Sequence, residues 1–221
     1  MQKALVIGAS GGIGTAVVAR LQGQGFAVTS LSRKIDGLDV TDAGSVDLHL
    51  GALQGEFDLV FVATGALEIN GAAPEKSLKQ LQAQAMAEQF AVNAIGPALI
   101  LKHASRLLPR DRRAVFVVLS ARVGSIGDNR LGGWYSYRAA KAALNQIIHT
   151  ASIELARSHP QAIIAALHPG TVATPFTRKF VKPENASVPE RAATNLLNVV
   201  QSLSQADSGG FFDYAGKRIA W

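Results

Sequence analysis

The sequence predicts a single-domain α/β fold, in which a doubly wound parallel sheet carries helices on both faces. Strand-like and helix-like segments alternate along the 221 residues. Two of the strand-like segments, Asp58–Ala63 and Ala114–Leu119, are almost continuously apolar, as expected of parallel strands covered on both sides. A glycine-rich stretch, GASGGIG, directly follows the first apolar segment. Repeated βα units of this kind give a parallel sheet with right-handed crossovers.

The first half of the chain supplies four expected strands. They are Lys3–Ile7, Phe26–Leu31, Leu38–Val40 and Asp58–Ala63. A helical pattern of apolar residues follows the glycines and ends near Gly25, and a weak helix should follow Val40. The region from Ser77 to Leu108 reads as helical, and Pro97 should kink it or mark a restart because proline lacks an amide hydrogen.

The second half continues the alternation. After Ala114–Leu119 we expect a helix that carries Tyr137 and ends near Arg157, a strand at Ala162–Leu167, a helix from Pro189 to about Ser204 and a last strand at Gly210–Tyr214. His168-Pro169-Gly170 breaks the strand that precedes it. With neither repeats nor a long linker, the whole chain, 1–221, is predicted to be a single domain.

Composition narrows the function. The chain has no cysteine, which excludes disulfides, thiolate metal sites and cysteine nucleophiles, and no metal site is expected. The N-terminus lacks a signal-peptide layout and no apolar run spans a membrane, so the expectation is a soluble cytoplasmic protein without a membrane partner. Net charge is +6. Arg106, Arg110, Arg112 and Arg113 gather in one stretch, but no aromatic-interleaved basic stripe accompanies them, and a solvated loop is favoured over nucleic-acid binding.

The glycine-rich turn predicts a dinucleotide site. Gly8, Gly12 and Gly14 let the backbone approach a pyrophosphate, whose charge then lies at a helix N-terminus. The spacing is G-x-x-x-G-x-G rather than the commoner G-x-G-x-x-G. The alternative is a glycine turn that serves only tight strand–helix packing.

The end of the second strand indicates which dinucleotide. Many NAD sites place an acid there to bind the ribose 2′-hydroxyl. Here the chain reads Ser-Leu-Ser-Arg-Lys, and Arg33 suits a 2′-phosphate. NADP is therefore favoured over NAD, unless Arg33 is only a surface residue.

Tyr137 and Lys141 form the candidate catalytic pair. Their spacing places both side chains on one helix face, one turn apart. A nearby ammonium favours the phenolate, so we expect the pKa of Tyr137 to be lowered toward a usable acid or base. The alternative is an exposed Tyr and an exposed Lys on a surface helix.

Together these motifs resemble the short-chain dehydrogenase/reductase family over essentially the whole chain. The glycine motif near the N-terminus and Tyr-x-x-x-Lys near the middle are highly specific in this order. More narrowly, SARVGSIGDN…GGWYSYRAAKAALN resembles the C-factor and sniffer-type carbonyl reductase subgroup. The resemblance implies a Rossmann-like fold and an NADP(H)-dependent enzyme that interconverts a small-molecule carbonyl and an alcohol.

The resemblance also implies roles for individual residues. Tyr137 would be the acid/base, Lys141 would lower its pKa and hold the nicotinamide ribose, Ser120 would supply the catalytic hydroxyl, and Asn93 would help hold a water relay behind the lysine. The cofactor would be bound by residues of the glycine turn, the second to fourth strand ends and the loop after Leu167: Gly8, Ser10, Gly11, Gly12, Ile13, Gly14, Arg33, Asp39, Val40, Ala63, Thr64, Gly65, Pro169, Gly170, Thr171, Val172 and Thr174.

Three departures from the family pattern stand out. Val62-Ala63-Thr64-Gly65 replaces the usual Asn-Asn-Ala-Gly, so an asparagine brace is missing. Ala140 replaces a common serine before the lysine, with a mild effect expected. The usual Ser-Ser pair reads Ser120-Ala121, which leaves three possibilities: Ser120 adjusts to serve, Ser125 substitutes, or no serine assists the substrate oxygen.

The substrate pocket would be built by the segments Arg122–Trp134 and Ala173–Val188. The second resembles a lid over an apolar pocket, although a plain surface loop fits equally well. Nearby arginines, at 122, 130 and 138, either favour an anionic substrate or are simply solvated. The resemblance leaves a homodimer, a homotetramer and a monomer open. Two other function classes also remain: an NADP-binding signalling or sensor protein of the C-factor type, and a pure interaction protein.

Overall fold

The computed structural model describes residues 1–221, apart from the side chain of Pro183. Six parallel strands form one sheet in the order β2-β1-β3-β4-β5-β6. Their bounds are β1 Lys3–Ile7, β2 Ala27–Leu31, β3 Leu59–Val62, β4 Ala114–Leu119, β5 Ala162–His168 and β6 Phe211–Asp213. The predicted doubly wound α/β architecture is therefore confirmed.

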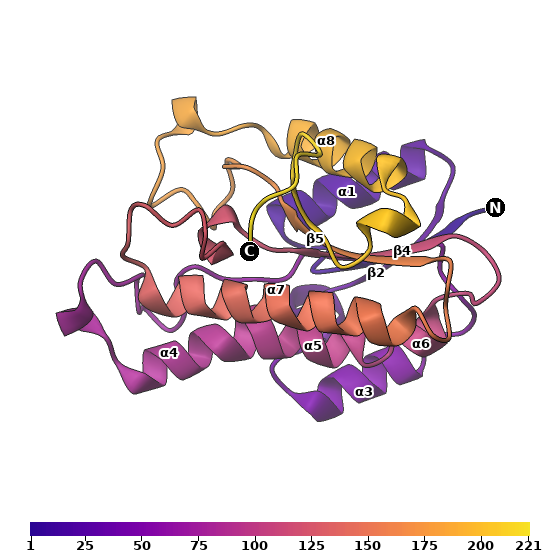
Figure 1. Ribbon diagram of the computed structural model, residues 1–221, viewed down its shortest axis with the longest axis horizontal. Helices are drawn as coiled ribbons and strands as arrows, with labels where there is room; N and C mark the ends of the chain where they lie inside the picture. The colour runs from indigo at the N-terminus through magenta and orange to yellow at the C-terminus, as the bar shows by residue number, and fades with distance from the viewer.

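Helices cover both faces of this sheet (Figure 1). α1 (Gly12–Gly23) and α8 (Pro189–Ser202) pack together on one face. The other face carries α3 (Ala43–Gly51), α4 (Ala83–Phe90), α5 (Gly96–Leu101), α6 (Ala104–Leu107) and α7 (Tyr135–Leu155). The remaining helical pieces are α2 (Arg33–Asp36), η1 (Leu78–Gln80), the π-helical η2 (Ala91–Ile95), η3 (Arg122–Gly124), η4 (Pro183–Asn185) and η5 (Gln205–Asp207).

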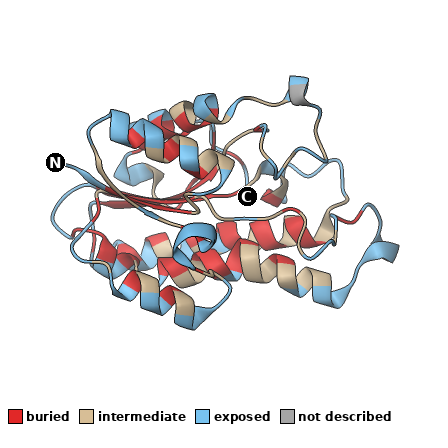
Figure 2. Ribbon diagram, turned by 180° about the vertical axis from the view of Figure 1, so that it is seen from behind, coloured by how far each residue is buried: buried red, intermediate tan, exposed pale blue. Residues whose placement is uncertain are grey.

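Two apolar layers result from the alternation of side chains along each strand. In β4, Phe116 and Val118 face the layer under α7, whereas Val115 and Val117 face the layer under α1 and α8. All residues of β3 and β4 are buried, which explains why these strands read as continuous apolar runs (Figure 2). Within the described part of the chain, no helix has the length and apolar character needed to cross a bilayer.

The expected strand at Leu38–Val40 is wrong, because this segment runs as a loop between α2 and α3. Leu38 is buried, but Asp39 turns the chain: its carboxylate accepts hydrogen bonds from the amide and the hydroxyl of Thr41 at 2.9 and 2.7 Å. β2 therefore pairs with β1 on one side and forms the edge of the sheet on the other.

The long helical region restarts at Pro97, as expected. Because Pro97 cannot donate a backbone hydrogen bond, the helix widens into the π turn η2 directly before it and continues as α5. This π turn matters for the site, since it carries Asn93.

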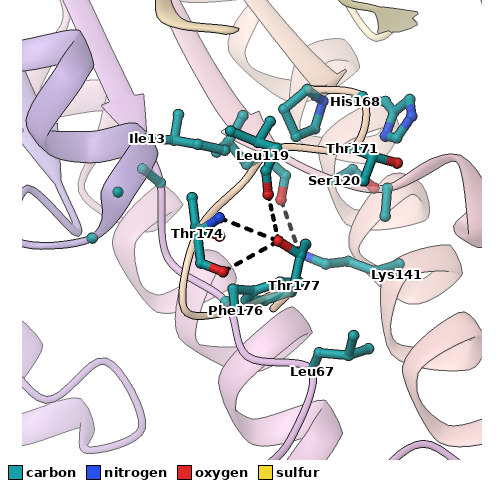
Figure 3. A pocket seen from close by; sticks show the side chains of 18 of the residues that line it. Ile13, Leu67, Leu119, Ser120, Lys141, His168, Thr171, Thr174, Phe176 and Thr177 are labelled. Carbon is teal, nitrogen blue, oxygen red and sulfur yellow. Dashed lines mark hydrogen bonds between the residues drawn. The ribbon is translucent and has the colours of Figure 1, made fainter. Parts of the chain in front are cut away.

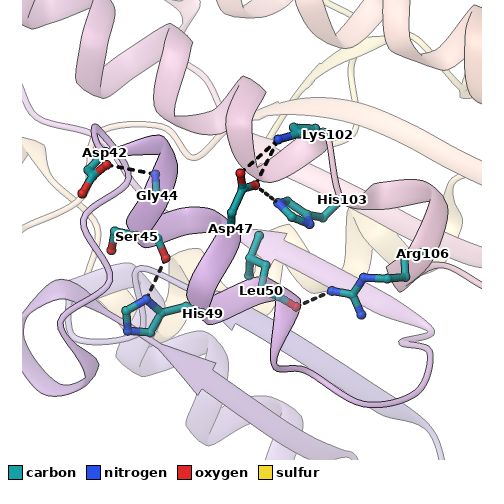
Figure 4. Close-up of polar contacts among 9 residues, drawn as sticks. All are labelled: Asp42, Gly44, Ser45, Asp47, His49, Leu50, Lys102, His103 and Arg106. Atoms are coloured by element: carbon teal, nitrogen blue, oxygen red, sulfur yellow. Dashed lines mark hydrogen bonds and ion pairs between the residues drawn. The ribbon is translucent and has the colours of Figure 1, made fainter.

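All four arginines of the stretch are exposed, as expected of solvated side chains, and three of them also bind neighbouring elements. Arg106 donates to the backbone carbonyls of Leu50 and Leu53 at the end of α3, where Asp47 also pairs with Lys102 and His103 (Figure 4). Arg112 pairs with Asp58 and Glu56, and Arg113 donates to carbonyls at the end of α8, including that of Val200. These guanidinium groups hold neighbouring elements together.

Candidate active site

A cavity of about 480 Å³ opens at the carboxyl ends of the central strands. Parallel strands end at one edge of the sheet, and the order β2-β1-β3 places the reversal of strand order between β1 and β3. Side chains from the turns after β1, β3, β4 and β5 and from the start of α7 meet there (Figure 3). The predicted site residues in its lining are Ser10, Gly11, Gly12, Ile13, Gly14, Ala63, Thr64, Gly65, Ser120, Tyr137, Lys141, Pro169, Gly170, Thr171, Val172 and Thr174.

The glycine turn forms one end of this cavity. Gly8 has φ +85°, a conformation that favours glycine, and a Cβ at Gly14 would overlap the carbonyl of Gly8. A Cβ at Gly12 would lie 2.6 Å from the Cγ2 atom of Thr174, across the cavity. The glycines thus serve close packing and leave a narrow space beside the turn.

The N-terminus of α1 is open toward that space. Its N-cap, Gly11, provides no side-chain cap, and the first turn carries no acidic residue. The hydroxyl oxygen of Thr64, which lines the cavity nearby, is buried without a hydrogen-bond partner among the described residues. Free helix amides and an unpaired hydroxyl fit the phosphate and ribose groups of a dinucleotide.

The residues predicted to select and hold the adenine end lie outside the cavity lining. Arg33 is exposed in the first turn of α2, just beyond β2. Hydrogen bonds from Thr41, aided by the charge of Arg33, lower the pKa of Asp39. Val40 packs so close to α5 that a Cβ at Gly96 would lie 2.9 Å from its Cγ2 atom. Gly8 and Asn93 also lie outside the lining, directly behind it.

Tyr137 and Lys141 lie on one face of α7 and contribute to the cavity wall. They are only 5% and 2% exposed, so the surface-helix interpretation is wrong. The Nζ atom of Lys141 donates to the backbone carbonyl of Leu119 at 2.9 Å and lies 5.9 Å from the centre of the Tyr137 ring. The end of β4 therefore fixes the lysine beneath the tyrosine.

The pKa of Tyr137 is not lowered, contrary to the expectation from spacing. Burial raises the pKa of the Tyr137 phenol, and burial also lowers the pKa of Lys141 to about 7. The charged form of each group loses its hydration inside the protein, and this penalty outweighs their mutual attraction. Tyr137 therefore holds its proton throughout the neutral range.

Asn93 is fully buried in the π turn and bridges to the loop after β3. Its Oδ1 atom accepts from the amide of Ala66 at 3.1 Å, and its Nδ2 atom donates to the carbonyl of Ala66 at 2.8 Å and to Oε1 of Gln89 at 2.7 Å. A Cβ at Gly65 would lie 3.1 Å from Asn93 Oδ1 and 3.6 Å from Lys141 Nζ. Asn93 and Lys141 are thus neighbours on either side of Gly65.

Of the three serine possibilities, the structure brings Ser120 and not Ser125 to the cavity. Ser120 donates its hydroxyl proton to Oδ1 of Asn145 at 2.6 Å, and both side chains are buried. The oxygen of Ser125 instead accepts from the amide of Asp128 at 3.0 Å, away from the lining. Ala121 lines the cavity where the family pattern has its second serine.

The segment after β5 covers the cavity, so it is not a plain surface loop. Gly170, with φ +75°, lets Tyr214 pack against the chain as it turns. Farther along, Phe176 lies edge-on to Tyr137 and Phe180 edge-on to Trp134, with ring centres 6.3 and 6.1 Å apart. A salt bridge of 2.7 Å joins Lys179 to Glu68 in the loop after β3. We call residues 173–188 the lid.

Sequence reasoning missed two residues of this site, Asn145 and His168. Asn145 follows Tyr137 and Lys141 at the same four-residue spacing, so the helix periodicity that predicted the pair could also have found it. His168 ends β5 at the ligand-binding edge of the sheet, where the general rule for parallel sheets already placed other candidates. Trp134 lines the cavity at the end of the predicted pocket segment Arg122–Trp134.

The chain was compared with families and with individual proteins. A family model described as Enoyl-(Acyl carrier protein) reductase matches residues 28–202. The 1-hydroxy-2-glutathionyl-2-methyl-3-butene dehydrogenase of Rhodococcus sp. (strain AD45) is 29% identical over 236 residues, which cover 100% of both chains. The C-signal of Myxococcus xanthus is 34% identical over 140 residues, covering 62% of this chain and 78% of that protein.

A solved structure supports the same fold. The NADPH-bound carbonyl reductase from chicken fatty liver superposes with a TM-score of 0.84 at 22% identity, over 100% of this chain and 94% of that one. At 22% identity, this similarity shows a shared fold and does not show a shared reaction.

Proposed function

This chain belongs to the short-chain dehydrogenase/reductase family, and on that premise we propose that it is an NADP(H)-dependent oxidoreductase that interconverts a carbonyl and an alcohol. The proposal treats residues 1–221 as one catalytic domain, with a small-molecule substrate. The observation that carries it is the buried Tyr137–Lys141 pair, which lies in the same cavity as the glycine turn.

The cofactor assignment rests on the fit of the glycine turn and of Arg33. The open N-terminus of α1 would hold the pyrophosphate, and Arg33 the 2′-phosphate. The loop from Pro169 to Thr174 would bind the nicotinamide end, and Asp39 and Val40 the adenine. When bound, NADPH supplies the hydride. NADPH in the structure of the chicken carbonyl reductase agrees with this choice of cofactor.

Tyr137 is the proposed proton donor to the carbonyl oxygen. The phenol is protonated at neutral pH, and because burial raises its pKa, donation of the proton depends on the stabilisation that Lys141 gives to the tyrosinate. Lys141 would stabilise the tyrosinate once the proton has left. The carbonyl of Leu119 orients the ammonium, and the neighbouring Asn93 would hold a water that returns a proton to it.

The substrate oxygen has no second hydroxyl donor of the usual kind. The hydroxyl of Ser120 donates its hydrogen bond to Asn145, and Ala121 has no hydroxyl. Loss of one donor aimed at a developing oxyanion lowers rates by roughly 10²-fold or more. The proposed enzyme therefore depends strongly on Tyr137.

The hydrogen bond of Ser120 to Asn145, together with the similarity to C-signal, favours one alternative: an NADP-binding signalling or sensor protein with little turnover. Such a protein would bind NADPH through the same glycine turn but reduce no carbonyl compound.

One experiment separates these functions. NADPH oxidation is followed with a panel of aldehydes and ketones, and NADPH binding is followed by nicotinamide fluorescence. Tyr137→Phe should lower kcat/KM by roughly 10²-fold or more, as for loss of a general acid, while the Kd for NADPH changes less than about twofold. Tyr135→Phe, two residues earlier on α7 and outside the cavity lining, is the matched control and should keep full activity.

The possible outcomes are distinct. NADPH binding without turnover of any carbonyl would support the signalling alternative. A loss of both NADPH binding and turnover in Tyr137→Phe would mean that the tyrosine has a structural role.

A further inference from the structure

The substrate end of the cavity is mainly apolar and aromatic. Trp134 lies edge-on to both Tyr137 and Phe180, with ring centres 6.3 and 6.1 Å apart, and Phe176 packs on the other side of Tyr137. Leu67 and Val181 continue this wall. Such a surface favours a flat, apolar substituent beside the reacting carbonyl.

The arginines near the cavity do not indicate an anionic substrate. Arg122 pairs with Asp128 and with Asp213, each at 3.0 Å, so its charge is already compensated. The guanidinium of Arg138 donates hydrogen bonds to the backbone carbonyls of residues 123, 132 and 133. Arg130 is exposed and outside the lining. The cavity therefore suits an uncharged substrate.

Two polar side chains of the lining have an unmet hydrogen-bonding need: Thr64 beside the glycine turn and His168 at the end of β5. The Nδ1 atom of His168 is buried and has no partner among the described residues. A buried polar atom without a partner destabilises the folded protein, because it has lost its hydrogen bonds to water. A ligand in the cavity could remove this cost by pairing with the imidazole.

The position of His168 suits contact with a ligand. It ends β5 beside Ser120, whose amide donates to the carbonyl of Leu167, and it pairs in register with Asp213 on β6. Figure 3 shows His168, Thr171 and Ser120 in the same part of the cavity. Burial and the charge of Arg122 lower the pKa of His168 to about 4, against the opposite effect of Asp213, so the ring is neutral at physiological pH.

We propose that His168 is a substrate-recognition residue that hydrogen-bonds a hydroxyl group on an uncharged, aromatic carbonyl substrate. A hydroxyl both donates and accepts, so it can pair with Nδ1 in either tautomer of a neutral imidazole. The apolar part of the substrate would rest against Trp134 and Phe176. This inference rests on the proposed carbonyl reductase function and names its substrate class.

The test compares benzaldehyde with meta- and para-hydroxybenzaldehyde and with meta-carboxybenzaldehyde, using NADPH. Wild-type protein should prefer at least one hydroxylated aldehyde over benzaldehyde by roughly tenfold in KM, the range of one hydrogen bond, and should disfavour the carboxylate. His168→Leu should remove this preference by raising KM for the hydroxylated aldehyde relative to KM for benzaldehyde. His168→Asn, whose amide can occupy the place of Nδ1, should restore part of the preference.

A second readout needs no turnover. The ring-nitrogen NMR signal of His168, identified by its absence in His168→Asn, should shift when meta- or para-hydroxybenzyl alcohol is added and not with benzyl alcohol. A hydroxyl preference that survives in His168→Leu, or no shift with either hydroxylated alcohol, would overturn the inference. If the protein reduces benzaldehyde but shows no preference for a hydroxylated aldehyde, the proposed reductase function holds and the role of His168 is rejected. A shift of the His168 signal without any reduction would support recognition by His168 and reject the reductase function.

Discussion

Replacing Lys141 with methionine should stabilise the protein at neutral pH. Burial lowers the pKa of Lys141 from 10.5 to about 7. A difference of this size corresponds to roughly 5 kcal/mol of stability lost by burying the amine, of which about 4 kcal/mol applies at pH 7. Methionine fills a similar volume without a charge, but it leaves the carbonyl of Leu119 without its 2.9 Å hydrogen bond, which costs about 1–2 kcal/mol. The expected net gain is about 2–3 kcal/mol at pH 7.

The stability difference between Lys141→Met and the wild type should change with pH. Between about pH 7 and 10.5 the unfolded chain binds a proton at Lys141 that the folded chain has released, so the free energy of unfolding of the wild type rises with pH. Lys141→Met lacks this contribution. Its advantage should therefore shrink as pH rises and reverse at the alkaline end, where the wild type keeps the hydrogen bond to Leu119 and no longer carries the charge penalty.

Urea unfolding, followed by circular dichroism across this pH range, measures the difference directly. Lys76→Met changes an exposed lysine and should leave the pH dependence of the wild type unaltered. Two results would refute the reasoning that burial controls the pKa of this lysine. The free energy of unfolding would change with pH in the same way for wild type and Lys141→Met, or Lys141→Met would be less stable than the wild type at every pH.

Two further substitutions test the cofactor site. Arg33→Ala should weaken NADPH binding roughly tenfold without changing the Kd for NADH, whereas Lys34→Ala, an exposed neighbour, should change neither; fluorescence titration measures both. Gly14→Ala should destabilise the protein by about 1–3 kcal/mol and abolish NADPH binding, because its Cβ overlaps the carbonyl of Gly8. Gly23→Ala, where a Cβ meets nothing within 4 Å, should keep binding and slightly stabilise α1 in thermal unfolding.

The fold could be predicted because its signals are local. Continuous apolar runs mark β3 and β4, whose residues are buried on both faces, and glycines mark the turn that leaves β1. The expected strand at Leu38–Val40 fails for a physical reason that a short pattern does not contain. Its apolar residues pack inward from a loop, and the turn at Asp39 is made by a side chain that bonds Thr41.

The chemistry of the site was less predictable, since it depends on contacts between distant segments. Spacing places Tyr137 and Lys141 on one face of α7, but their pKa values depend on burial, which the spacing does not reveal. The state of Ser120 likewise depends on Asn145, which lies 25 positions along the chain. The unpaired nitrogen of His168 becomes apparent only once the neighbouring strands and η3 are in place.

The raised pKa of Tyr137 also bears on the direction of the proposed reaction. Reduction of a carbonyl needs a phenol that holds its proton, which an ordinary phenol also does at neutral pH, and the raised pKa makes Tyr137 a weaker acid that relies on Lys141 to stabilise the tyrosinate. Oxidation of an alcohol needs the tyrosinate, whose charge is disfavoured in the same surroundings, while Lys141 with a pKa near 7 is only partly charged and gives limited support. The proposed reduction therefore starts with Tyr137 protonated, whereas oxidation of an alcohol starts from the scarce tyrosinate, so the rate of oxidation should rise with pH more strongly than the rate of reduction does.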